Sequence, residues 1–231
     1  LPHGGRKDGK SMIISCMGHA KFVIELDNGL RVVTDPYDAS CGYPVTANPA
    51  DVVLVSHQHH DHNAVETIPG NPRVIDRAGD FDLGGGAAVR AIEAYHDEQQ
   101  GKLRGKTLLF CLKAEGLTVM HLGDLGHMLT TEQRLLLGSA DIVMLPVGGY
   151  YTMDAPMAKQ VADVLHARVI LPMHYKTAAN ASWPIAPVAD FLRLYPEKAE
   201  ELPLLRVSAG DLSCQPRLVV LMPLSLGNVK A

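Results

Sequence analysis

Residues 56–62 read SHQHHDH and directly follow the apolar run VVLV at 52–55. An unbroken run of apolar β-branched residues is typical of a strand that is covered on both faces. Imidazole is a poor core side chain and a good metal ligand, so four histidines at the end of a buried strand favour a metal site. A solvated polar loop is the alternative, but a motif this dense is far more specific than a single His-x-His pair.

The spacing inside this motif suggests two metal positions. His57 and His59 are two residues apart, so on an extended segment their side chains point to the same side and can bind one ion. Asp61 and His62 follow, where the chain should turn away from the strand. We therefore expect this pair to face a second ion beside the first.

A metal centre needs more ligands than one short segment can aim, and three candidates occur where other predicted strands give way to loops. His96 follows a β-like segment, Asp124 ends a predicted hairpin, and His174 ends an apolar strand. Functional residues on a rigid scaffold often occupy such positions. The expected arrangement is one ion held by His57, His59 and His96, a second held by Asp61, His62 and His174, and Asp124 as the bridge between them.

The rest of the chain predicts a β-rich first half followed by alternating strands and helices. A DNG turn and an AEG turn predict two hairpins, and Thr130 with Gln133 has the spacing of a capping box. The predicted strands cover 11–17, 21–26, 31–35, 51–56, 72–76, 106–113, 117–122, 141–147 and 168–173. Helices are predicted after Thr130 and over 154–167 and 186–195. The loops expected to form the walls of a pocket are 36–50, 77–90 and 176–187. No linker or repeat interrupts this pattern, so we expect one domain over 11–231 after a flexible tail at 1–10.

The composition restricts location and partners. The chain has 231 residues with a net charge of −4, which offers no global attraction for nucleic acid or an anionic membrane. No apolar stretch reaches the ~20 residues that span a bilayer, and the first ten residues lack the apolar centre of a signal peptide. We therefore expect a cytoplasmic protein without membrane or nucleic-acid partners. The four cysteines form no CxxC pair and predict neither a zinc ribbon nor a disulfide framework.

The order and rough spacing of these motifs resemble the metallo-β-lactamase superfamily. HQHHDH, the single His96, the Gly-Asp pair at 123–124 and His174 carry this resemblance, which extends over most of the chain. It implies an α+β fold, the four-layer αββα sandwich, and it supports the ligand assignment above. Segments such as MGHAKFVIE, TDPY, PVGGYYTMDA and PMHY look most like the branch that contains ascorbate-6-phosphate lactonase and many uncharacterised metal-dependent hydrolases.

Departures from other branches narrow the expected activity. The flavodiiron oxygen reductases carry Glu where His59 stands, and true metallo-β-lactamases generally lack the bridging acid at Asp124. Ribonuclease-type members usually add an RNA-binding arm or a further domain, for which a chain of 231 residues leaves little room. These differences disfavour redox chemistry, antibiotic hydrolysis and RNA cleavage, and they favour a small-molecule substrate.

Such a centre would hydrolyse a small ester, lactone or phosphoester. Two ions ~3.5–4 Å apart can share a water and lower its pKa from ~15.7 toward ~7, which supplies a bridging hydroxide. Nitrogen and oxygen ligands suit zinc or manganese, and iron less well. A non-catalytic, metal-stabilised ligand-binding scaffold and a nuclease of the same fold are the alternatives. A homo-oligomer is possible.

Further residues are candidates for roles beside the metals. Asp61 could orient the water or relay a proton. The resemblance places His19 and His127 near the pocket, where we expect them to contact substrate; plain hydrogen-bonded histidines are the alternative. Asp35 is expected to fix the tautomer of a ligand histidine, unless it only forms an Asp–Pro turn. His121 is expected to be a hydrogen-bonded residue of a strand.

Overall fold

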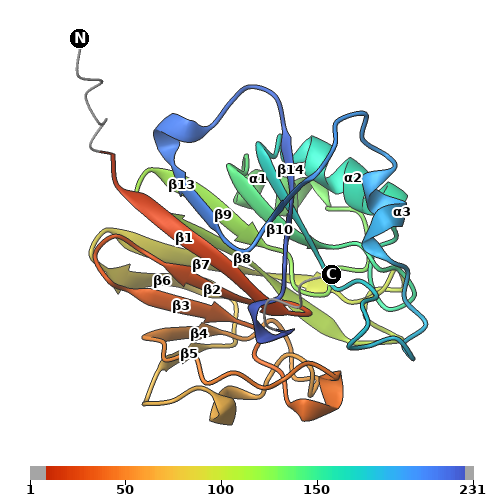
Figure 1. Ribbon diagram of the computed structural model, residues 1–231, viewed down its shortest axis with the longest axis horizontal. Helices are drawn as coiled ribbons and strands as arrows, with labels where there is room; N and C mark the ends of the chain where they lie inside the picture. Colours follow the sequence, from red (N-terminus) through yellow and green to blue (C-terminus); the bar gives the residue numbers. More distant parts are fainter. Residues whose placement is uncertain (1–8, 227–231) are drawn as a thin grey trace.

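Two mixed β-sheets pack face to face at the centre of the molecule (Figure 1). The computed structural model describes residues 9–226. The first sheet has six strands in the order β13-β1-β2-β3-β4-β5, in which β1, β2, β3 and β13 pair antiparallel and β4 and β5 continue parallel to β3. The bounds of its strands are β1 Ser11–Gly18, β2 Lys21–Glu25, β3 Arg31–Thr34, β4 Val52–Leu54, β5 Arg73–Ile75 and β13 Leu205–Ser208.

The second sheet has eight strands in the order β12-β14-β11-β10-β9-β8-β7-β6. Strands β6 to β9 form an antiparallel meander, and β9, β10, β11, β14 and β12 are parallel. The bounds of its strands are β6 Gly79–Gly84, β7 Ala87–Tyr95, β8 Lys106–Ala114, β9 Leu117–His121, β10 Ile142–Pro146, β11 Val169–Met173, β12 Glu200–Leu202 and β14 Arg217–Leu221.

Hydrophobic residues fill the space between the sheets and the space behind the second sheet. The central core combines side chains of both sheets, such as Ile14 and Phe110, neither more than 1% exposed. Three helices, α1 Thr131–Leu137, α2 Ala155–Val164 and α3 Val188–Leu192, follow strands of the second sheet, and a second core that includes Val161 and Phe191 lies between them and that sheet. Over the outer face of the first sheet, the 3-10 turn η2 Val65–Thr67 and its neighbours cover a smaller cluster.

This architecture is the predicted α+β sandwich, with one difference in its outer layers. Among the described residues, all three α-helices belong to the side of the second sheet, and the covering of the first sheet consists of loops and 3-10 turns. Each of the nine predicted strands and three predicted helices overlaps an observed element. Thr130 and Gln133 form the predicted capping box at the start of α1.

The prediction of a loop over 77–90 is wrong, because strands β6 and β7 form a hairpin there. Most side chains of β6 are exposed, since this strand is the edge of its sheet, and its sequence GDFDLG therefore lacks the apolar content of an inner strand. The GGG segment at 84–86 makes the turn, and all three glycines have positive φ. The C-terminal strands β12, β13 and β14 were not predicted, and of the predicted tail at 1–10, residues 1–8 lie outside the described part of the chain.

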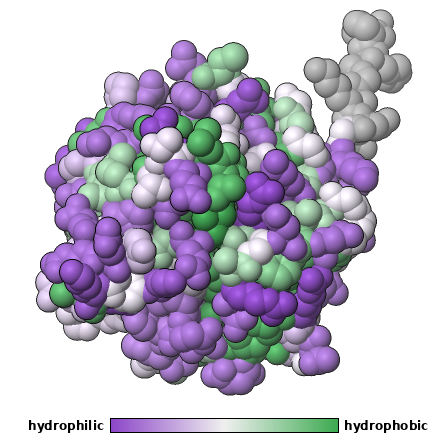
Figure 2. All heavy atoms as spheres, turned by 180° about the vertical axis from the view of Figure 1, so that it is seen from behind, coloured by the Kyte–Doolittle hydropathy of each residue, from purple (hydrophilic) through white to green (hydrophobic). Residues whose placement is uncertain are grey.

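One face of the molecule is seen with its side chains in Figure 2, and most of them are hydrophilic. Figure 2 shows the face behind that of Figure 1, where hydrophobic residues gather in a band surrounded by hydrophilic ones. Within residues 9–226, no helix combines the length and the apolar character needed to cross a bilayer.

Candidate metal centre

The candidate ligands come together at one end of the two sheets. His57–His62 follow β4, His96 follows β7, and His174 follows β11. Carboxyl ends of parallel strands meet at the same edge of a sheet, and loops there carry side chains into a common space. The turn between β1 and β2 adds His19, whose carbonyl accepts the backbone N–H of His174 at 3.2 Å.

Unusual backbone conformations concentrate at this end of the molecule. His19, Asp35 and His174 have φ angles of 54°, 38° and 52°, in the left-handed region that side chains with a Cβ rarely adopt. Such conformations persist where the surroundings over-determine them, and they cluster at functional sites. Gly123 allows a further close approach, because a Cβ at this position would lie 2.7 Å from the carbonyl oxygen of Leu108.

Asp124 is the centre of the cluster. Its Oδ2 lies 3.0 Å from Nε2 of His96, 3.2 Å from Nε2 of His174 and 3.9 Å from Nε2 of His57. Its Oδ1 lies 3.3 Å from Nε2 of His62. One carboxylate thus faces four imidazoles, two from the HQHHDH motif and two from distant loops, as a bridging acid would.

A second carboxylate faces the other side of the cluster. Oδ2 of Asp61 lies 3.1 Å from Nε2 of His19 and 3.5 Å from Nε2 of His62. Three groups of side chains are close enough to hold a metal ion: His57, His59 and His96; His19, Asp61, His62 and His174; and His57, His62 and Asp124. The structure therefore brings all seven sequence-predicted metal ligands together, and it adds His19 to the side of Asp61.

Asp35 controls the protonation of two imidazoles. Its Oδ2 accepts the hydroxyl proton of Ser56 at 2.7 Å and lies 2.9 Å from Nδ1 of His62. Because the Ser56 proton is committed to Asp35, Oγ of Ser56 accepts from Nδ1 of His57 at 2.9 Å. His57 and His62 are therefore both protonated at Nδ1, and their Nε2 lone pairs point into the cluster. Asp35 has the predicted tautomer-fixing geometry.

His96 is oriented in the same way by a backbone group. Its Nδ1 donates to the carbonyl oxygen of Tyr151 at 3.0 Å, so its Nε2 presents a lone pair to the Asp124 carboxylate. A lone pair and a carboxylate oxygen 3.0 Å apart repel each other unless a cation or a proton lies near both. A divalent cation held by His96 and Asp124 would remove this repulsion.

Several atoms of the cluster are buried and have no hydrogen-bond partner in the structure. They include Nε2 of His57, Nε2 of His62 and Oδ1 of Asp124. Leaving a buried polar atom without a partner costs about 1–3 kcal/mol, so such atoms rarely occur in groups. All three face the same space and are metal-ligand atoms, so the residues present fit a bound divalent cation.

Electrostatics keep two imidazoles of the cluster neutral and favour positive charge near its carboxylates. Burial lowers the pKa of His57 to about 3 and that of His19 to about 4, which keeps both imidazoles neutral at pH 7. Burial acts to raise the pKa of Asp124, but the surrounding histidines hold it well below its usual range. Burial also acts to lower the pKa of His62, yet the nearby carboxylates raise it well above its ordinary value. The cluster thus attracts positive charge at its centre.

A cavity of about 520 Å³ opens above the cluster. Ser40 and Trp183 line it from the 36–50 and 176–187 loops, as predicted, whereas the 77–90 segment contributes no residue to its lining. Sequence reasoning missed Arg104 in this lining, because its segment carried no recognisable motif. The lining residues are Ser40, His59, His60, Asp61, His96, Leu103, Arg104, Asp124, Tyr151, His174 and Trp183.

The structure does not bring His127 to the cluster. Its Nδ1 donates to the carbonyl oxygen of Met128 at 2.7 Å, and its Nε2 accepts from the backbone N–H of Tyr95 at 3.1 Å. Nε2 therefore supports the end of β7 and Nδ1 bonds within its own loop, and the side chain does not line the cavity. The expected substrate contact of His127 is not supported, and the alternative of a hydrogen-bonded histidine describes it. His121 likewise bonds to backbone, with Nε2 3.0 Å from the carbonyl oxygen of Ala20.

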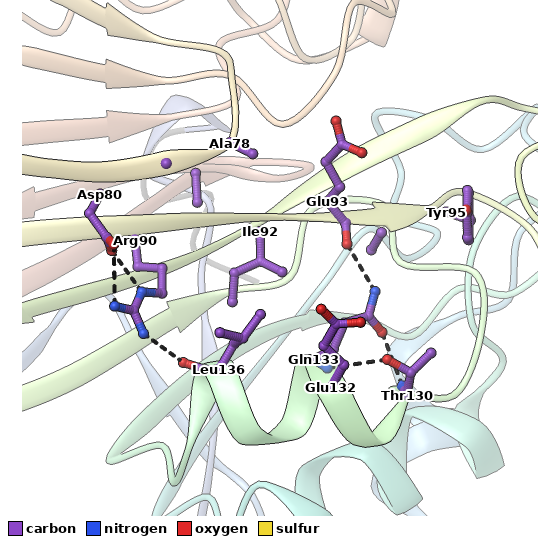
Figure 3. A pocket seen from close by; sticks show the side chains of 13 residues that line it. Ala78, Asp80, Arg90, Ile92, Glu93, Tyr95, Thr130, Glu132, Gln133 and Leu136 are labelled. Atoms are coloured by element: carbon purple, nitrogen blue, oxygen red, sulfur yellow. Dashed lines mark hydrogen bonds and ion pairs between the residues drawn. The ribbon is translucent and has the colours of Figure 1, made fainter.

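A groove of about 590 Å³ between the β6–β7 hairpin and α1 has a different character (Figure 3). Arg90 pairs with Asp80 at 2.7 Å, and Gln133 donates to the carbonyl oxygen of Glu93 at 2.9 Å. Gln133 also exchanges hydrogen bonds with Thr130 in the capping box. Arg90, Asp80, Gln133 and Thr130 thus have polar partners within the groove, and none of the three metal-ligand groups lies there.

Comparison with known proteins defines the class. The profile of the β-lactamase superfamily domain matches residues 13–174, which is more than half of the chain. A crystal structure from Thermotoga maritima, assigned to the Zn-dependent hydrolases of the metallo-β-lactamase superfamily, has 39% sequence identity and a TM-score of 0.76. The similarity covers 91% of this chain and 98% of that one.

Curated relatives define the family within this class. A protein of Thermococcus kodakarensis is 30% identical over 222 residues, covering 81% of this chain and 93% of the relative. One of Nanoarchaeum equitans is 31% identical over 220 residues, covering 82% and 94%. Both are named UPF0173 metal-dependent hydrolases, and the chain belongs to this family of the β-lactamase superfamily. The closer resemblance to ascorbate-6-phosphate lactonase stays a prediction.

Proposed function

We propose that the chain hydrolyses a small ester, lactone or phosphoester with the help of two divalent cations. The observation that carries this proposal is the group of buried His57, His62 and Asp124 atoms that lack hydrogen-bond partners and face one space. Fixed tautomers direct the Nε2 lone pairs of His57 and His62 toward the carboxylates, and binding a cation is the function that explains this arrangement. The names of the relatives support hydrolysis as the reaction.

The ligands divide into two sets with a shared acid. We assign His57, His59 and His96 to one cation, Asp61, His62 and His174 to the other, and Asp124 to both. When bound, two such cations supply an activated water and a Lewis acid for the scissile bond. The all-nitrogen-and-oxygen ligand set suits zinc or manganese.

Asp61 and His19 form the pair that orients a water in this proposal. Nε2 of His19 lies 3.1 Å from Oδ2 of Asp61, and the Asp61 side chain lines the cavity. Burial acts to raise the pKa of Asp61, but His62 and His19 together hold it far below its usual range, so this carboxylate is ionised at neutral pH. Asp61 can therefore accept a hydrogen bond from a water in the cavity and orient it, while His19 keeps the carboxylate in place.

The cavity lining favours a small substrate over nucleic acid. Arg104 is the only Arg or Lys side chain in that lining within the described residues. An adjoining groove carries both signs of charge, including Lys106 paired with Glu93 at 2.7 Å. A nucleic-acid channel needs an array of cations along its length, which these walls do not offer. Cytoplasmic location and a homo-oligomer stay predictions.

The test is metal analysis combined with a substrate panel. Purified protein is stripped with a chelator, reconstituted with zinc, manganese or iron, and assayed by elemental analysis and against generic esters, lactones and phosphodiesters. We expect about two equivalents of metal per chain and metal-dependent turnover of at least one class. Retention of metal without turnover on any class would favour the ligand-binding scaffold, and failure to retain any divalent ion would refute the metal centre.

A further inference from the structure

One cation stands in the wall of the metal cavity without a carboxylate partner. Arg104 lines the same cavity as His59, His96 and Asp124. Its side chain takes part in none of the ion pairs or side-chain hydrogen bonds of residues 9–226. Five other arginines of this part of the chain pair with a carboxylate, namely Arg31, Arg90, Arg168, Arg193 and Arg217. Arg73, Arg77, Arg134 and Arg206 do not, but none of these four lines the cavity.

Aromatic side chains hold this guanidinium in place. Its Cζ lies 5.6 Å from the ring centroid of Tyr151 and 6.0 Å from that of Tyr150. Stacking on an aromatic ring leaves the planar fork of N–H donors free for a further partner. The Tyr151 ring also lies edge-on to Trp183, with ring centroids 6.2 Å apart. Arg104, Tyr151 and Trp183 therefore form one continuous wall of the cavity.

The backbone beneath Arg104 is fixed by a buried carboxylate. Asp97, only 4% exposed, accepts the backbone N–H groups of Gln99 and Gly101 at one oxygen and those of Leu103 and Arg104 at the other. The four distances lie between 2.8 and 3.0 Å. This loop begins immediately after His96, so the candidate metal ligand and the arginine share one rigid support.

The same segment connects the arginine to the cluster on its other side. The Tyr151 carbonyl accepts the Nδ1 proton of His96 at 3.0 Å, while the Tyr151 ring stacks with Arg104. One residue thus orients a candidate ligand with its backbone and a free guanidinium with its side chain. A guanidinium that is held in this way, beside the reaction centre and without a counterion, is suited to bind an oxyanion.

We propose that Arg104 forms an anion-binding subsite and that the natural substrate carries a carboxylate or phosphate group away from the scissile bond. This proposal deepens the proposed function by naming the substrate class. It rests on that function because it takes the cavity to be the substrate site. A fork of N–H donors matches two oxygens of either anion, which gives orientation as well as affinity. Arg104 is then a specificity-determining residue rather than a ligand of the metals.

The test measures anion binding directly and needs no turnover. Trp183 is the only tryptophan of the chain and lines the cavity, so its fluorescence reports occupancy. Metal-loaded wild type, Arg104→Gln, Arg104→Lys and Arg77→Gln are titrated separately with inorganic phosphate and acetate. Arg77 is the matched control because it is an arginine of the adjoining groove that does not line the cavity.

We expect Arg104→Gln to weaken binding of at least one anion by about tenfold or more, Arg104→Lys to have an intermediate effect, and Arg77→Gln to have none. An effect on phosphate alone assigns the subsite to phosphates, and an effect on acetate alone assigns it to carboxylates. Equal binding by wild type and Arg104→Gln, equal losses in Arg104→Gln and Arg77→Gln, or no anion binding by wild type would overturn the proposal.

Two controls separate this result from misfolding and from failure of the metal centre. The unliganded Trp183 emission and the urea midpoint of Arg104→Gln should match those of wild type, and Arg104→Lys keeps the charge if they do not. In a substrate panel, Arg104→Gln should raise KM for anionic esters or lactones about tenfold and leave KM for neutral ones unchanged. A protein that retains metal but turns over no substrate refutes the proposed hydrolysis, while the titrations still decide the subsite.

Discussion

The metal cavity and the groove beside α1 have similar volumes, about 520 and 590 Å³, but opposite polar character. In the groove, Arg90 pairs with Asp80 and Gln133 bonds to Glu93 and Thr130. In the cavity, buried imidazole and carboxylate atoms face each other without hydrogen-bond partners. A site is therefore recognised here by polar atoms that the fold leaves unsatisfied, and not by the size of a depression.

Of the substitutions that compare the two regions, Asp124→Asn in the metal cavity should have the largest effect on activity. Replacement by Asn keeps the shape but removes the negative charge that four imidazoles face, so at least one metal position should be lost. We expect kcat/KM to fall about a thousandfold or more, with a loss of bound metal. Elemental analysis and steady-state kinetics measure both. Unchanged metal content and activity would remove Asp124 from the centre.

The next effect concerns the support of the cavity wall. Replacing Asp97 by Asn puts an NH₂ group opposite two backbone N–H donors, because each carboxylate oxygen accepts two. We expect a loss of about 3 kcal/mol in the free energy of unfolding, measured by urea denaturation. Asp82→Asn is the control, since among the described residues the exposed Asp82 side chain accepts only the Gly84 N–H, and its replacement should change stability by less than about 0.5 kcal/mol. Similar losses in both variants would contradict this account.

A buried lysine at the start of β2 gives a pH-dependent prediction. Lys21 has no exposed surface, and its Nζ donates to the Thr46 carbonyl at 2.8 Å. Burial lowers its pKa from 10.5 to about 8. Between pH 8 and 10 the unfolded chain therefore binds more protons at this residue than the folded protein, so its contribution to stability improves as pH rises.

Lys21→Met removes this dependence. The difference in unfolding free energy between wild type and Lys21→Met should shift by about 2 kcal/mol in favour of wild type from pH 8 to pH 10. Lys106→Met is the control, because Lys106 is exposed and Glu93 raises its pKa, so its difference should stay nearly constant over this range. A constant difference for Lys21→Met as well would show that burial does not shift its pKa.

The smallest effect on stability and activity is expected from a substitution in the groove beside α1. Arg90→Gln breaks an exposed pair with Asp80, which should cost less than about 1 kcal/mol of stability. It should leave metal content and kcat/KM unchanged, as measured beside Asp124→Asn. A large loss of activity in Arg90→Gln would mean that the groove takes part in function and would break the contrast between the two regions.

Local patterns in the sequence predicted the elements that carry the centre. The apolar run before HQHHDH, the turn signals of two hairpins and the capping box at Thr130 each depend on neighbouring residues, and all of these elements are observed. The seven candidate ligands could be predicted because each follows or ends such an element. The β6 strand could not, because an exposed edge strand has little apolar content to distinguish it from a loop.

Side-chain roles that depend on distant partners were less predictable. His19 and His127 both follow a glycine and looked equivalent in the sequence, yet only His19 joins the cluster. The direction of a side chain in a loop depends on which nearby backbone groups need hydrogen bonds. The backbone N–H of Tyr95 donates to Nε2 of His127, which holds this imidazole away from the cluster. Trp183 and Arg104 line the cavity without any motif in their segments.

The sequence by itself determined nine of the strands, the three helices and the seven candidate ligands including Asp124, because alternation, capping and strand ends are local properties. The packing of the two sheets decided the rest. Only that packing places Asp35 and Ser56 so that the His57 and His62 lone pairs face inward, and only the Asp97 loop places Arg104 on Tyr151. Hydrogen bonds and ring contacts act over a few ångströms between residues far apart in the chain, so the tertiary structure alone determines them.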